Sequence, residues 1–525
     1  MNNSSSTLSI EVSNMTKLVS IIIPVYNSAP FLKECLDSVA AQTYRPLEVI
    51  IINDGSTDNS EEIIRTYLDT YSFFSYVSQE NHGLGYTRNK GINLSRGESI
   101  FFLDSDDIIP EHAIEMLTRA KEKCGADFAA GKVLRFTNER NYIPVRHHEF
   151  GLYEKDTCIA LSSEPRLVQD SIACNKLWSA SFLKEHSLYF EEGKYYEDMH
   201  LTLKAAVLAR KIAIVKEPVY LWRVREEANS PSITQQRMKL RNTLDRITAL
   251  NLNKEWLTKT GINQKIATEH DLKALLDVLR LHVEKYALVD KTDREDWQKA
   301  ICSFLSDFSA AAIALLPHKE KTLYDLAVSG QLSDLLLFSQ LYTGTETMPI
   351  VHQSENRFYL KGAEATYDIT ADIKPHASVV DFEEQEGKWS LRGKLKVPKA
   401  SQSPSGRFYA TGKKFKKEVT LSSVTFEPIP NKSFYPFEKQ TFTLLLHSDE
   451  FKDKQLENGY DFYFCLDGGK PVRIKASKSL ELRLVSYQTS KRKVSLYRTE
   501  YGNLSLQVHK GFFYNLLRKI YRLIK

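Results

Sequence analysis

The sequence predicts a multidomain protein in which an α/β domain comes first, a helical segment follows and a region of short antiparallel strands comes last. At 525 residues the chain is several times longer than an ordinary domain. Apolar strand-like runs alternate with helical patterns up to residue 233, long helical patterns follow, and stretches of alternating apolar and polar residues begin after residue 345. With 42% hydrophobic and 26% charged residues, the composition is globular and excludes a mostly disordered chain.

The α/β domain is expected to span residues 17–233, after a flexible lead-in at 1–16. Its predicted strands are Leu18–Tyr26, Leu47–Asn53, Phe73–Ser78 and Glu98–Leu103. Its predicted helices begin near Ser28 and Pro30, at a capping box formed by Asp58 and Glu61, and at Leu84. Leu18–Tyr26 is apolar and rich in β-branched residues, as a strand covered on both faces requires. Strands alternating with helices predict a mostly parallel sheet with right-handed crossovers.

Two further regions follow this domain. Residues 234–345 show helical spacing of apolar residues, for example at Leu272, Leu275, Leu276, Leu279 and Val283, and we expect a helical linker domain. Residues 346–509 alternate apolar and polar side chains over Ser390–Leu395, Glu418–Phe426, Thr441–His447, Tyr460–Leu466 and Leu480–Val485. This pattern predicts an antiparallel β-sandwich of roughly immunoglobulin size, as one domain or two small ones.

Neither the cysteines nor the apolar runs point to secretion or to a membrane span. The six cysteines form no CxxC pair and are widely spaced, which favours reduced thiols without a metal or redox role. The polar N-terminus is no secretion signal. No apolar run approaches the roughly 18–20 residues of a spanning helix. We therefore expect a cytoplasmic protein.

Acidic and polar residues follow three of the predicted strands. They are Pro24–Asn27, Asn53–Asp58 and Asp104–Asp107. Ligands of open α/β sheets bind beyond the carboxyl ends of the strands, so we expect these turns to share one rim. Three carboxylates within Asp104–Asp107 repel one another unless a cation offsets them. Mg²⁺ or Mn²⁺, completed by substrate phosphates and water, is the expected cofactor.

Between the acidic turns lies the glycine-containing stretch Asn81–Asn89. Its glycines permit a close approach of the backbone to a ligand, and Arg88 can meet phosphate or carboxylate with two parallel hydrogen bonds. Together with the acidic turns, this stretch predicts a site for a nucleotide diphosphate.

Four ordered motifs, SIIIPVYN, NDGSTD, GxGxxRN and FLDSDD, make residues 17–235 resemble family 2 glycosyltransferases of the GT-A fold. The resemblance implies that Pro24, Val25 and Tyr26 flank the nucleobase and that Asp54 hydrogen-bonds it. It also implies that Asp104 lies on the ribose side and that Asp106 ligates the metal that bridges the diphosphate. The other residues that we assign to nucleotide-sugar binding are Asn81, Arg88, Ser105, Arg223 and Arg225. For Asp58 we favour a purely structural capping role.

The family's catalytic base lies in a Glu-Asp pair on the acceptor side, which Glu197 and Asp198 match. Asp198 is the expected general base and Glu197 its supporting neighbour; the alternative is an exposed helix start that carries acids near its positive end. The stretch Trp222–Thr234 contains Arg223 and Arg225, and we expect it to be a mobile loop over the diphosphate, with a plain solvated loop as the alternative. The family implies a single displacement with inversion, from an α-linked donor to a β-glycoside.

The whole architecture resembles the wall teichoic acid glycosyltransferases of Gram-positive bacteria. This resemblance implies a UDP-sugar donor, N-acetylglucosamine or another hexose as the sugar, poly(ribitol phosphate) as acceptor, and trimers formed through the C-terminal domain. An enzyme of capsule or lipid-linked polysaccharide synthesis is the alternative, because the same residues would serve it. A non-catalytic glycan-binding scaffold is a different class, against which the intact Asp104, Asp106 and Asp198 argue. No nucleic acid is expected as a partner.

The net charge of +5 is concentrated at the C-terminus. Residues 510–525 contain five basic residues and no acid, so the other 509 residues are balanced. Apolar residues share one face of this predicted helix and basic residues the other, which is typical of a helix that lies on an anionic membrane surface. Docking on the protein itself, or binding of a polyanionic acceptor, are the alternatives. The expected location is therefore peripheral, at the inner face of the cell membrane.

Overall fold

The computed structural model describes residues 17–137, 141–225, 236–343 and 351–510, the last range with short gaps. The gaps are 355–356, 373–374, 386–387, 399–405, 422, 429–436, 448–450, 452–457, 468, 478–479, 481–485, 489–491 and 500–501. The chain divides into two compact units, one of Met1–Leu134 and Val145–Arg223, the other of Arg135–Pro144 and Val224–Lys525. The finer division that we expected near residue 345 stays a prediction.

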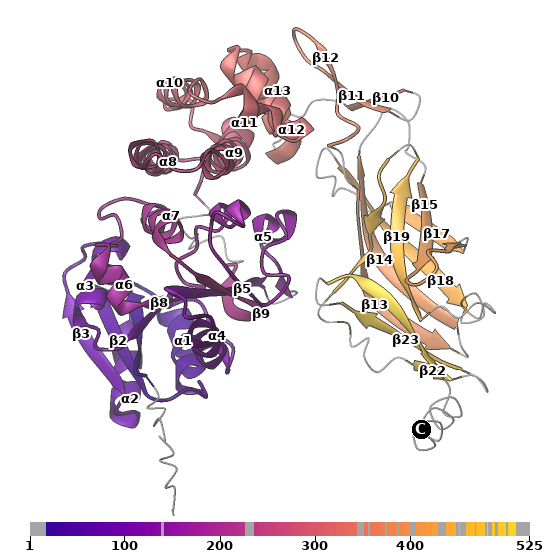
Figure 1. The fold of residues 1–525 in the computed structure, drawn as a ribbon. Helices are drawn as coiled ribbons and strands as arrows, with labels where there is room; N and C mark the ends of the chain where they lie inside the picture. Colours follow the sequence, from indigo (N-terminus) through magenta and orange to yellow (C-terminus); the bar gives the residue numbers. More distant parts are fainter. Residues whose placement is uncertain are drawn as a thin grey trace, which may run out of the picture. The chain divides into compact units, whose positions relative to one another are not determined.

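The first unit is built on a sheet with helices on both sides of it (Figure 1). In pairing order the strands are β3 (Phe74–Gln79), β2 (Leu47–Asp54), β1 (Val19–Val25), β4 (Ser99–Phe102), β8 (Lys176–Ser179), β5 (Phe128–Phe136), β9 (Ile212–Arg223) and β7 (Thr157–Ile159), and β6 (Asn141–Tyr142) pairs with β5. The first four strands pair in parallel, as predicted. The pairs β4–β8, β8–β5 and β9–β7 are antiparallel.

The helices of the first unit are α1 (Ala29–Ala40), α2 (Ser60–Thr70), α3 (Leu84–Leu94), α4 (Ala113–Cys124), α5 (Val145–Glu149), α6 (Ala180–Glu185), α7 (Asp198–Leu208) and the 3₁₀ helix η1 (Pro165–Gln169). Three of them, α1, α2 and α3, lie close to the predicted positions; the others were not predicted. All seven residues of β1 are buried, and α1 buries its apolar stripe, so the pattern of the sequence is the pattern of the core.

Asp58 does not form the predicted capping box. The residue that precedes α2 is Asn59, and one carboxylate oxygen of Asp58 accepts from the backbone N–H and the hydroxyl of Ser60, at 3.1 and 2.6 Å. The other oxygen accepts from the backbone N–H of Ala29, at 2.9 Å. Because Ala29 opens α1, Asp58 ties the starts of two helices together. The capping-box prediction is wrong because α2 begins two residues after Asp58 and because one group that Asp58 binds, the N–H of Ala29, lies far away in the sequence.

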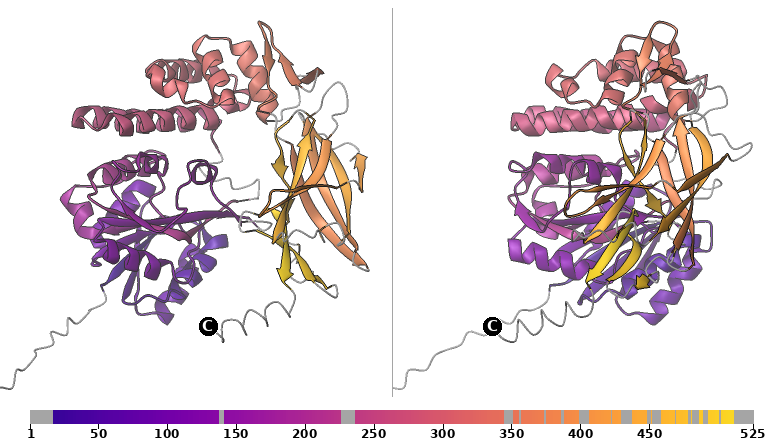
Figure 2. Two further views of the ribbon diagram at one scale, coloured as in Figure 1. Left: turned by 45° about the vertical axis from the view of Figure 1, so that its right-hand side comes forward. Right: turned by 90° about the vertical axis from the view of Figure 1, so that its right-hand side faces the viewer.

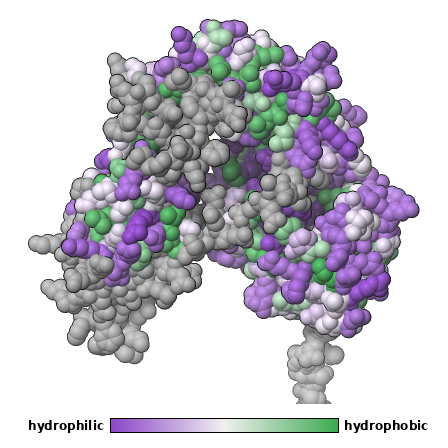
Figure 3. Space-filling model, turned by 180° about the vertical axis from the view of Figure 1, so that it is seen from behind, coloured by the Kyte–Doolittle hydropathy of each residue, from purple (hydrophilic) through white to green (hydrophobic). Residues whose placement is uncertain are grey.

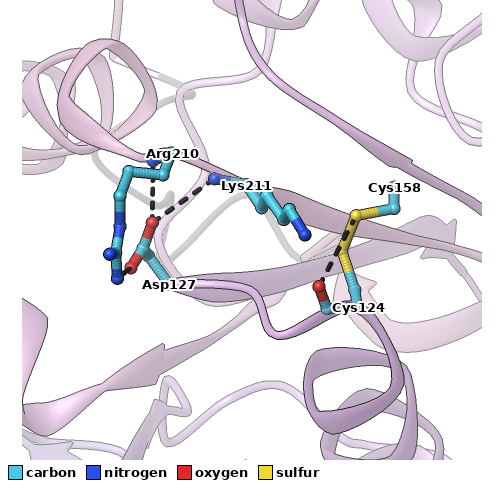
Figure 4. The surroundings of a disulfide bond; sticks show 5 residues. All are labelled: Cys124, Asp127, Cys158, Arg210 and Lys211. Atoms are coloured by element: carbon cyan, nitrogen blue, oxygen red, sulfur yellow. Dashed lines mark hydrogen bonds and ion pairs between the residues drawn. A yellow bond between two sulfur atoms is a disulfide. The ribbon is translucent and has the colours of Figure 1, made fainter.

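A disulfide joins Cys124, at the end of α4, to Cys158 in β7 (Figure 4). The prediction that all six cysteines are reduced is therefore wrong for this pair; Cys35, Cys174, Cys302 and Cys465 are free. The two cysteines are 34 residues apart in sequence, but the Cα atoms are 5.9 Å apart. Wide spacing misled us because the fold brings the end of α4 beside the terminal strand of the sheet.

The second unit begins with a group of helices (Figure 2). They are α8 (Leu240–Thr260), α9 (Gln264–Leu281), the 3₁₀ helix η3 (Val283–Leu288), α10 (Arg294–Leu305), α11 (Ala310–Ala314), α12 (His318–Val328) and α13 (Leu332–Thr343). The apolar positions that predicted the helical segment, Leu272 to Val283, are all buried.

This helical core also contains a fully buried histidine. Nδ1 of His282 lies 3.2 Å from the carbonyl oxygen of Arg237 and 3.0 Å from the hydroxyl of Thr243. A carbonyl can only accept, so Nδ1 carries the proton; Nε2 has no hydrogen-bond partner within the described part of the chain. Burial, and then the charge of Arg246, lower the pKa of His282 to about 3. The imidazole is therefore neutral in the folded protein.

The rest of the second unit is made of strands in three sheets. The first sheet has β10 (Val351–Ser354), β11 (Arg357–Lys361) and β12 (Thr366–Asp368). The second has, in pairing order, β17 (Val424–Pro428), β18 (Phe437–His447), β14 (Lys388–Pro398), β13 (His376–Gln385) and β21 (Lys475–Ala476). The third has β16 (Glu418–Leu421), β15 (Gly406–Gly412), β19 (Gly459–Leu466), β24 (Leu504–Lys510), β23 (Arg492–Arg498) and β22 (Ser486–Gln488), with β20 (Val472–Arg473) on β19.

The two larger sheets pack together through aromatic side chains. The ring of Phe408 in β15 lies 4.8 Å from that of Phe442 in β18, centroid to centroid. The strand predicted at Glu418–Phe426 is in fact two strands, β16 and β17, which belong to different sheets. The alternation of apolar and polar residues could not show the break between the strands, because it continues through both of them. The immunoglobulin-like arrangement stays a prediction.

Within the described ranges, none of the helices is both long and apolar enough to cross a membrane. Figure 3 shows a largely hydrophilic surface on which hydrophobic residues gather mainly among the helices at the top. The predicted basic helix lies outside the described residues, apart from Lys510, which ends β24. The lead-in at 1–16 and most of the predicted strand Leu480–Val485 also lie outside them.

The disulfide predicts a definite count of thiols. In denaturant without reductant, we expect iodoacetamide to modify four of the six cysteines and peptide mapping to recover Cys124 linked to Cys158; with reductant, all six should react. Closing a loop of 34 residues should stabilise the fold by about 2–4 kcal/mol, so the double variant Cys124→Ser/Cys158→Ser should unfold at lower urea. Six reactive thiols without reductant would contradict the assignment.

His282 predicts a loss of stability in mild acid. With a pKa of about 3 in the folded state and about 6.5 in the unfolded state, only the unfolded chain takes up this proton between those values. The neutral His282 therefore contributes fully to the free energy of unfolding above pH 6.5, and this contribution is lost as the pH falls toward 3. Between pH 7 and 5 the loss amounts to about 2 kcal/mol. His282→Asn keeps a side-chain N–H donor close to the position of Nδ1, and its amide cannot titrate. Urea unfolding at several pH values should show that the free energy of unfolding falls more steeply with acid in the wild type than in His282→Asn. An equal fall in both proteins would contradict the prediction.

Candidate active site

The three polar turns predicted to share one rim are joined by hydrogen bonds. The side-chain oxygen of Asn27, after β1, accepts from the backbone N–H of Thr57, after β2, at 2.8 Å. The hydroxyls of Ser28 and Ser105 lie 2.6 Å apart and connect the turn after β1 with the turn after β4. The parallel pairing of β2, β1 and β4 brings these turns together, so the predicted common rim is confirmed.

The end of β1 offers one exposed ring. Pro24 and Val25 are buried inside the strand, whereas Tyr26 is 52% exposed. Asn27 follows in a left-handed conformation with φ 47°, which turns the chain sharply away from the strand. Of the three residues that the resemblance places beside a nucleobase, Tyr26 is therefore the one with an accessible side chain.

Asp54 organises the loop that follows β3. One carboxylate oxygen accepts from the side-chain amide of Gln79 at 2.7 Å and from the backbone N–H of His82 at 2.9 Å. The other accepts from the backbone N–H of Gly83 at 2.8 Å. Asp54 is 4% exposed. It therefore shapes the loop that holds Asn81, whatever contact it makes with a base.

Asn81 is exposed on this loop and lies against the turn after β2. A Cβ atom placed on Gly55 would lie 3.0 Å from the backbone nitrogen of Asn81, and Gly55 has φ 77°. The close approach of the two loops therefore requires glycine at position 55. This packing keeps Asn81 at the rim.

The acidic turn after β4 contains carboxylates of different character. Asp107 is 2% exposed and accepts from the hydroxyl of Tyr220 at 2.6 Å and from the backbone N–H of Arg223 at 2.7 Å. Burial, and then the charges of Asp106 and Asp104, raise the pKa of Asp107 well above its ordinary value. Asp107 is thus a structural anchor, whereas Asp104 and Asp106 are only half-buried.

The acidic turn was the predicted place of a metal ion. Across the described residues, no group of three or more His, Cys, Asp or Glu side chains could hold a metal by itself. Mg²⁺ and Mn²⁺ commonly bind one or two carboxylates and take the remaining oxygens from phosphate and water. Asp106, which is half-buried beside Asp104, fits this mode of binding.

Arg88 lies beneath the rim rather than on it. Its side chain is 3% exposed, and its guanidinium donates to Asp104 at 2.5 Å and to Glu197 through its other terminal nitrogen. Burial opposes the charge, but Asp104, Cys174 and Glu197 hold the pKa of Arg88 well above its ordinary value. Of the two partners that the sequence suggested, phosphate or carboxylate, the structure records carboxylate.

Glu197 and Asp198 stand at the start of α7, on the far side of Arg88 from the acidic turn. Glu197 is 8% exposed and precedes the helix, and Asp198 is its first residue. Tyr196 has φ 64°, a rare conformation for a bulky residue and a mark of functional sites. Because Glu197 is buried in an ion pair, the alternative of an exposed helix start fails for Glu197.

Arg223 closes the other side of the acidic turn. Its Nε donates to the backbone oxygen of Asp106 at 2.6 Å, and a terminal nitrogen donates to Glu34 of α1 at 2.6 Å. It thus braces the turn of the predicted metal ligand. Arg225 belongs to the second unit and its part in the site stays a prediction, and the predicted loop lies outside the described residues from 226 onward.

Several residues of the site escaped the sequence reasoning. Tyr220 contacts the acidic turn, Cys174 contacts Arg88, and Glu34 accepts from Arg223. Asn89 holds the segment before Glu197. Asn89 lies in the GxGxxRN motif. Tyr220 and Glu34 carried no local signal, because each acts through a contact across more than 70 residues.

Residues 20–186 match the family model described as Glycosyl transferase family 2, so this segment is a family 2 glycosyl transferase domain. Glycosyltransferase GlyA of Streptococcus pneumoniae serotype 4 is 32% identical over 227 residues, 42% of this chain and 32% of GlyA. The poly(ribitol-phosphate) beta-glucosyltransferase of Bacillus spizizenii is 31% identical over 220 residues, 41% of this chain and 33% of that enzyme. The chain thus spans about a third of the length of each relative.

A solved structure covers nearly the whole chain. The crystal structure of S. aureus TarS is similar with a TM-score of 0.54 and 17% identity, over 95% of this chain and 86% of TarS. A crystal structure of TarS 1–349 in complex with UDP-GlcNAc aligns with a TM-score of 0.50 and 19% identity, over 67% of this chain and 98% of that fragment. At these identities the likeness shows the fold, which for the N-terminal domain is GT-A-like.

Asp54 provides a test of the rim's construction. Asp54→Ala leaves two backbone N–H groups of the 79–83 loop without their acceptor, and we expect it to lower the free energy of unfolding by about 2–4 kcal/mol. Asp54→Asn keeps one accepting oxygen and should lower the free energy of unfolding by clearly less. Urea denaturation compares the two variants; equal losses would show that the carboxylate oxygens do not hold the loop.

Proposed function

We propose that the protein is an inverting glycosyltransferase that moves a sugar from a UDP-sugar to a hydroxyl of a cell-surface polymer. One observation carries this proposal: at the carboxyl edge of the sheet, buried Arg88 joins the acidic turn at Asp104 to the Glu197–Asp198 pair. A donor side and an acceptor side thus stand on either side of one guanidinium. The family 2 match of residues 20–186 supports the same reaction class.

On the donor side, the exposed ring of Tyr26 and the loop shaped by Asp54 would receive the nucleobase and ribose. Asp106, supported by Asp104, would hold Mn²⁺ or Mg²⁺ against the diphosphate; the metal, when bound, supplies charge that stabilises the leaving group. Arg223 would keep the turn of Asp106 in place through its contacts to the backbone of Asp106 and to Glu34. These residues bind and orient the donor.

On the acceptor side, Asp198 would take the proton of the attacking hydroxyl. Its place at the first turn of α7 favours a carboxylate, because the positive end of a helix stabilises an anion. Glu197, held by Arg88, would fix the position of Asp198 next to it in sequence. The hydroxyl then displaces the nucleotide from the opposite face of the sugar, which inverts the anomeric centre.

The similar proteins support a class of donor and a class of acceptor. The TarS fragment of the same fold is solved with UDP-GlcNAc, which supports UDP-GlcNAc or a related UDP-hexose as donor. The Bacillus relative is named for poly(ribitol phosphate), which supports a polyol-phosphate polymer as acceptor. A capsule or lipid-linked saccharide remains the alternative acceptor. Binding to an anionic membrane through residues 510–525 and assembly through the C-terminal region belong to the same proposal.

The test is a screen for UDP release. Purified full-length protein is incubated with UDP-GlcNAc, UDP-glucose and UDP-galactose, with Mg²⁺ or Mn²⁺, and with poly(ribitol phosphate) or lipid-linked saccharides. We expect metal-dependent release that requires one acceptor class, and a β-linked product by NMR. No release from any donor and acceptor pair would refute the function.

Three variants separate the assigned roles. Asp198→Asn should keep UDP binding and lower transfer by about 10²–10⁴-fold, because it removes the general base. Asp106→Ala should abolish the metal dependence of UDP binding. Asp69→Asn, at an exposed position of α2, is the matched control and should change neither. Transfer retained by Asp198→Asn would exclude Asp198 as the base.

A further inference from the structure

Arg88 occupies a position from which it can hold two functional segments but cannot easily reach a ligand. It projects from the middle of α3, is 3% exposed, and uses both terminal nitrogens for carboxylates, one to Asp104 and one to Glu197. The two partners lie 16 and 109 residues away in sequence. No other cation makes a recorded ion pair with either carboxylate within the described part of the chain.

Neighbouring side chains fix the guanidinium in place. The Phe190 ring lies under it, 5.0 Å from the guanidinium carbon, and the sulfur of Cys174 lies 3.5 Å from one terminal nitrogen. The remaining nitrogen, Nε, is buried without a hydrogen-bond partner among the described residues. A swing toward a diphosphate would therefore break both ion pairs and leave half-buried Asp104 and buried Glu197 without their shared cation.

The same face of α3 holds the whole segment that leads to Glu197. A Cβ atom on Gly85 would lie 2.1 Å from the carbonyl oxygen of Glu191, so the segment lies directly against the helix. The side chain of Asn89 accepts from the backbone N–H of Phe190 at 2.8 Å and donates to its carbonyl at 2.9 Å. Gly85, Arg88 and Asn89 are spaced by three and four residues, which places them on one face of the helix.

We propose that Arg88 is a positioning residue that locks the donor-side turn at Asp104 to the acceptor-side pair Glu197–Asp198, and that it does not bind the donor phosphate. This inference rests on the proposed function for the meaning of the two sides. It departs from the role in nucleotide binding that the sequence suggested. Its consequence is that Arg88 links the leaving-group side to the general-base side directly, which favours a single productive geometry.

The kinetic test uses Arg88→Lys, which keeps the charge but replaces the planar fork, whose two terminal nitrogens each bind one carboxylate, by a single ammonium nitrogen. With the full chain, we expect the UDP dissociation constant, measured with Mn²⁺ by calorimetry, and the donor KM to stay within about threefold of wild type. We expect kcat to fall by about 30-fold or more, because a misplacement of about 1 Å costs on the order of 100-fold. Arg65→Lys, an exposed arginine of α2, is the matched control and should leave both unchanged.

A double-mutant cycle tests the lock without reference to catalysis. Asp104→Asn and Glu197→Gln, singly and together, are measured by urea unfolding in the wild-type and Arg88→Lys backgrounds. When Arg88 is present, we expect the effects of Asp104→Asn and Glu197→Gln on the free energy of unfolding to be non-additive, because the two carboxylates interact through the shared guanidinium. In the Arg88→Lys background we expect the two effects to be additive. If wild type releases no UDP, the proposed function fails, and the cycle still decides whether Arg88 joins the two segments.

Two results would overturn the inference. If Arg88→Lys weakened UDP binding by the same factor as it lowered kcat, Arg88 would be a donor ligand. If the cycle were additive in the wild-type background, Arg88 would not join the two segments. Circular dichroism of Arg88→Lys establishes that it is folded; should it unfold, Glu197→Gln, which leaves Arg88 in place and keeps the side-chain shape, should show the same loss of kcat with UDP binding retained.

Discussion

The site depends on gathering carboxylates at one edge of a sheet without driving them apart. Asp104, Asp106, Asp107, Glu197 and Asp198 all lie close to Arg88 or to the acidic turn. Like charges in a partly buried site repel strongly, and each needs a donor or a cation. Arg88 neutralises two of them, and Tyr220 with the backbone of Arg223 satisfies a third. These three carboxylates are therefore satisfied by groups of the protein itself.

The parallel sheet makes this arrangement possible. The turns after β1, β2 and β4 meet because parallel strands end at the same edge, and short hydrogen bonds such as Ser28 to Ser105 then fix their spacing. The carboxylates of Asp58 and Asp54 also hold backbone N–H groups of neighbouring segments. Several acids of the motifs are thus part of the frame.

The elements that the sequence predicted well are those whose signal is local. The α3 helix matches Leu84–Leu94 and the buried leucines of α9 match the predicted stripe, because apolar periodicity records which face is covered. The prediction of one strand at Glu418–Phe426 was wrong, because the chain passes there from one sheet to another while the apolar and polar residues keep alternating. The prediction of reduced cysteines was wrong for Cys124 and Cys158, because spacing in the sequence carries no information on distance in the fold.

The sequence by itself determined the α/β order, the common rim of polar turns and the resemblance to family 2 glycosyltransferases, because periodicity and motif order are properties of neighbouring residues. Only the tertiary structure decided what each polar side chain does there. Arg88 pairs with carboxylates, Asp107 is buried and Asp58 ties two helices, since each role depends on a partner from a distant segment. A motif names the residues at a site, whereas burial and pairing, which exist only after folding, assign their physical roles.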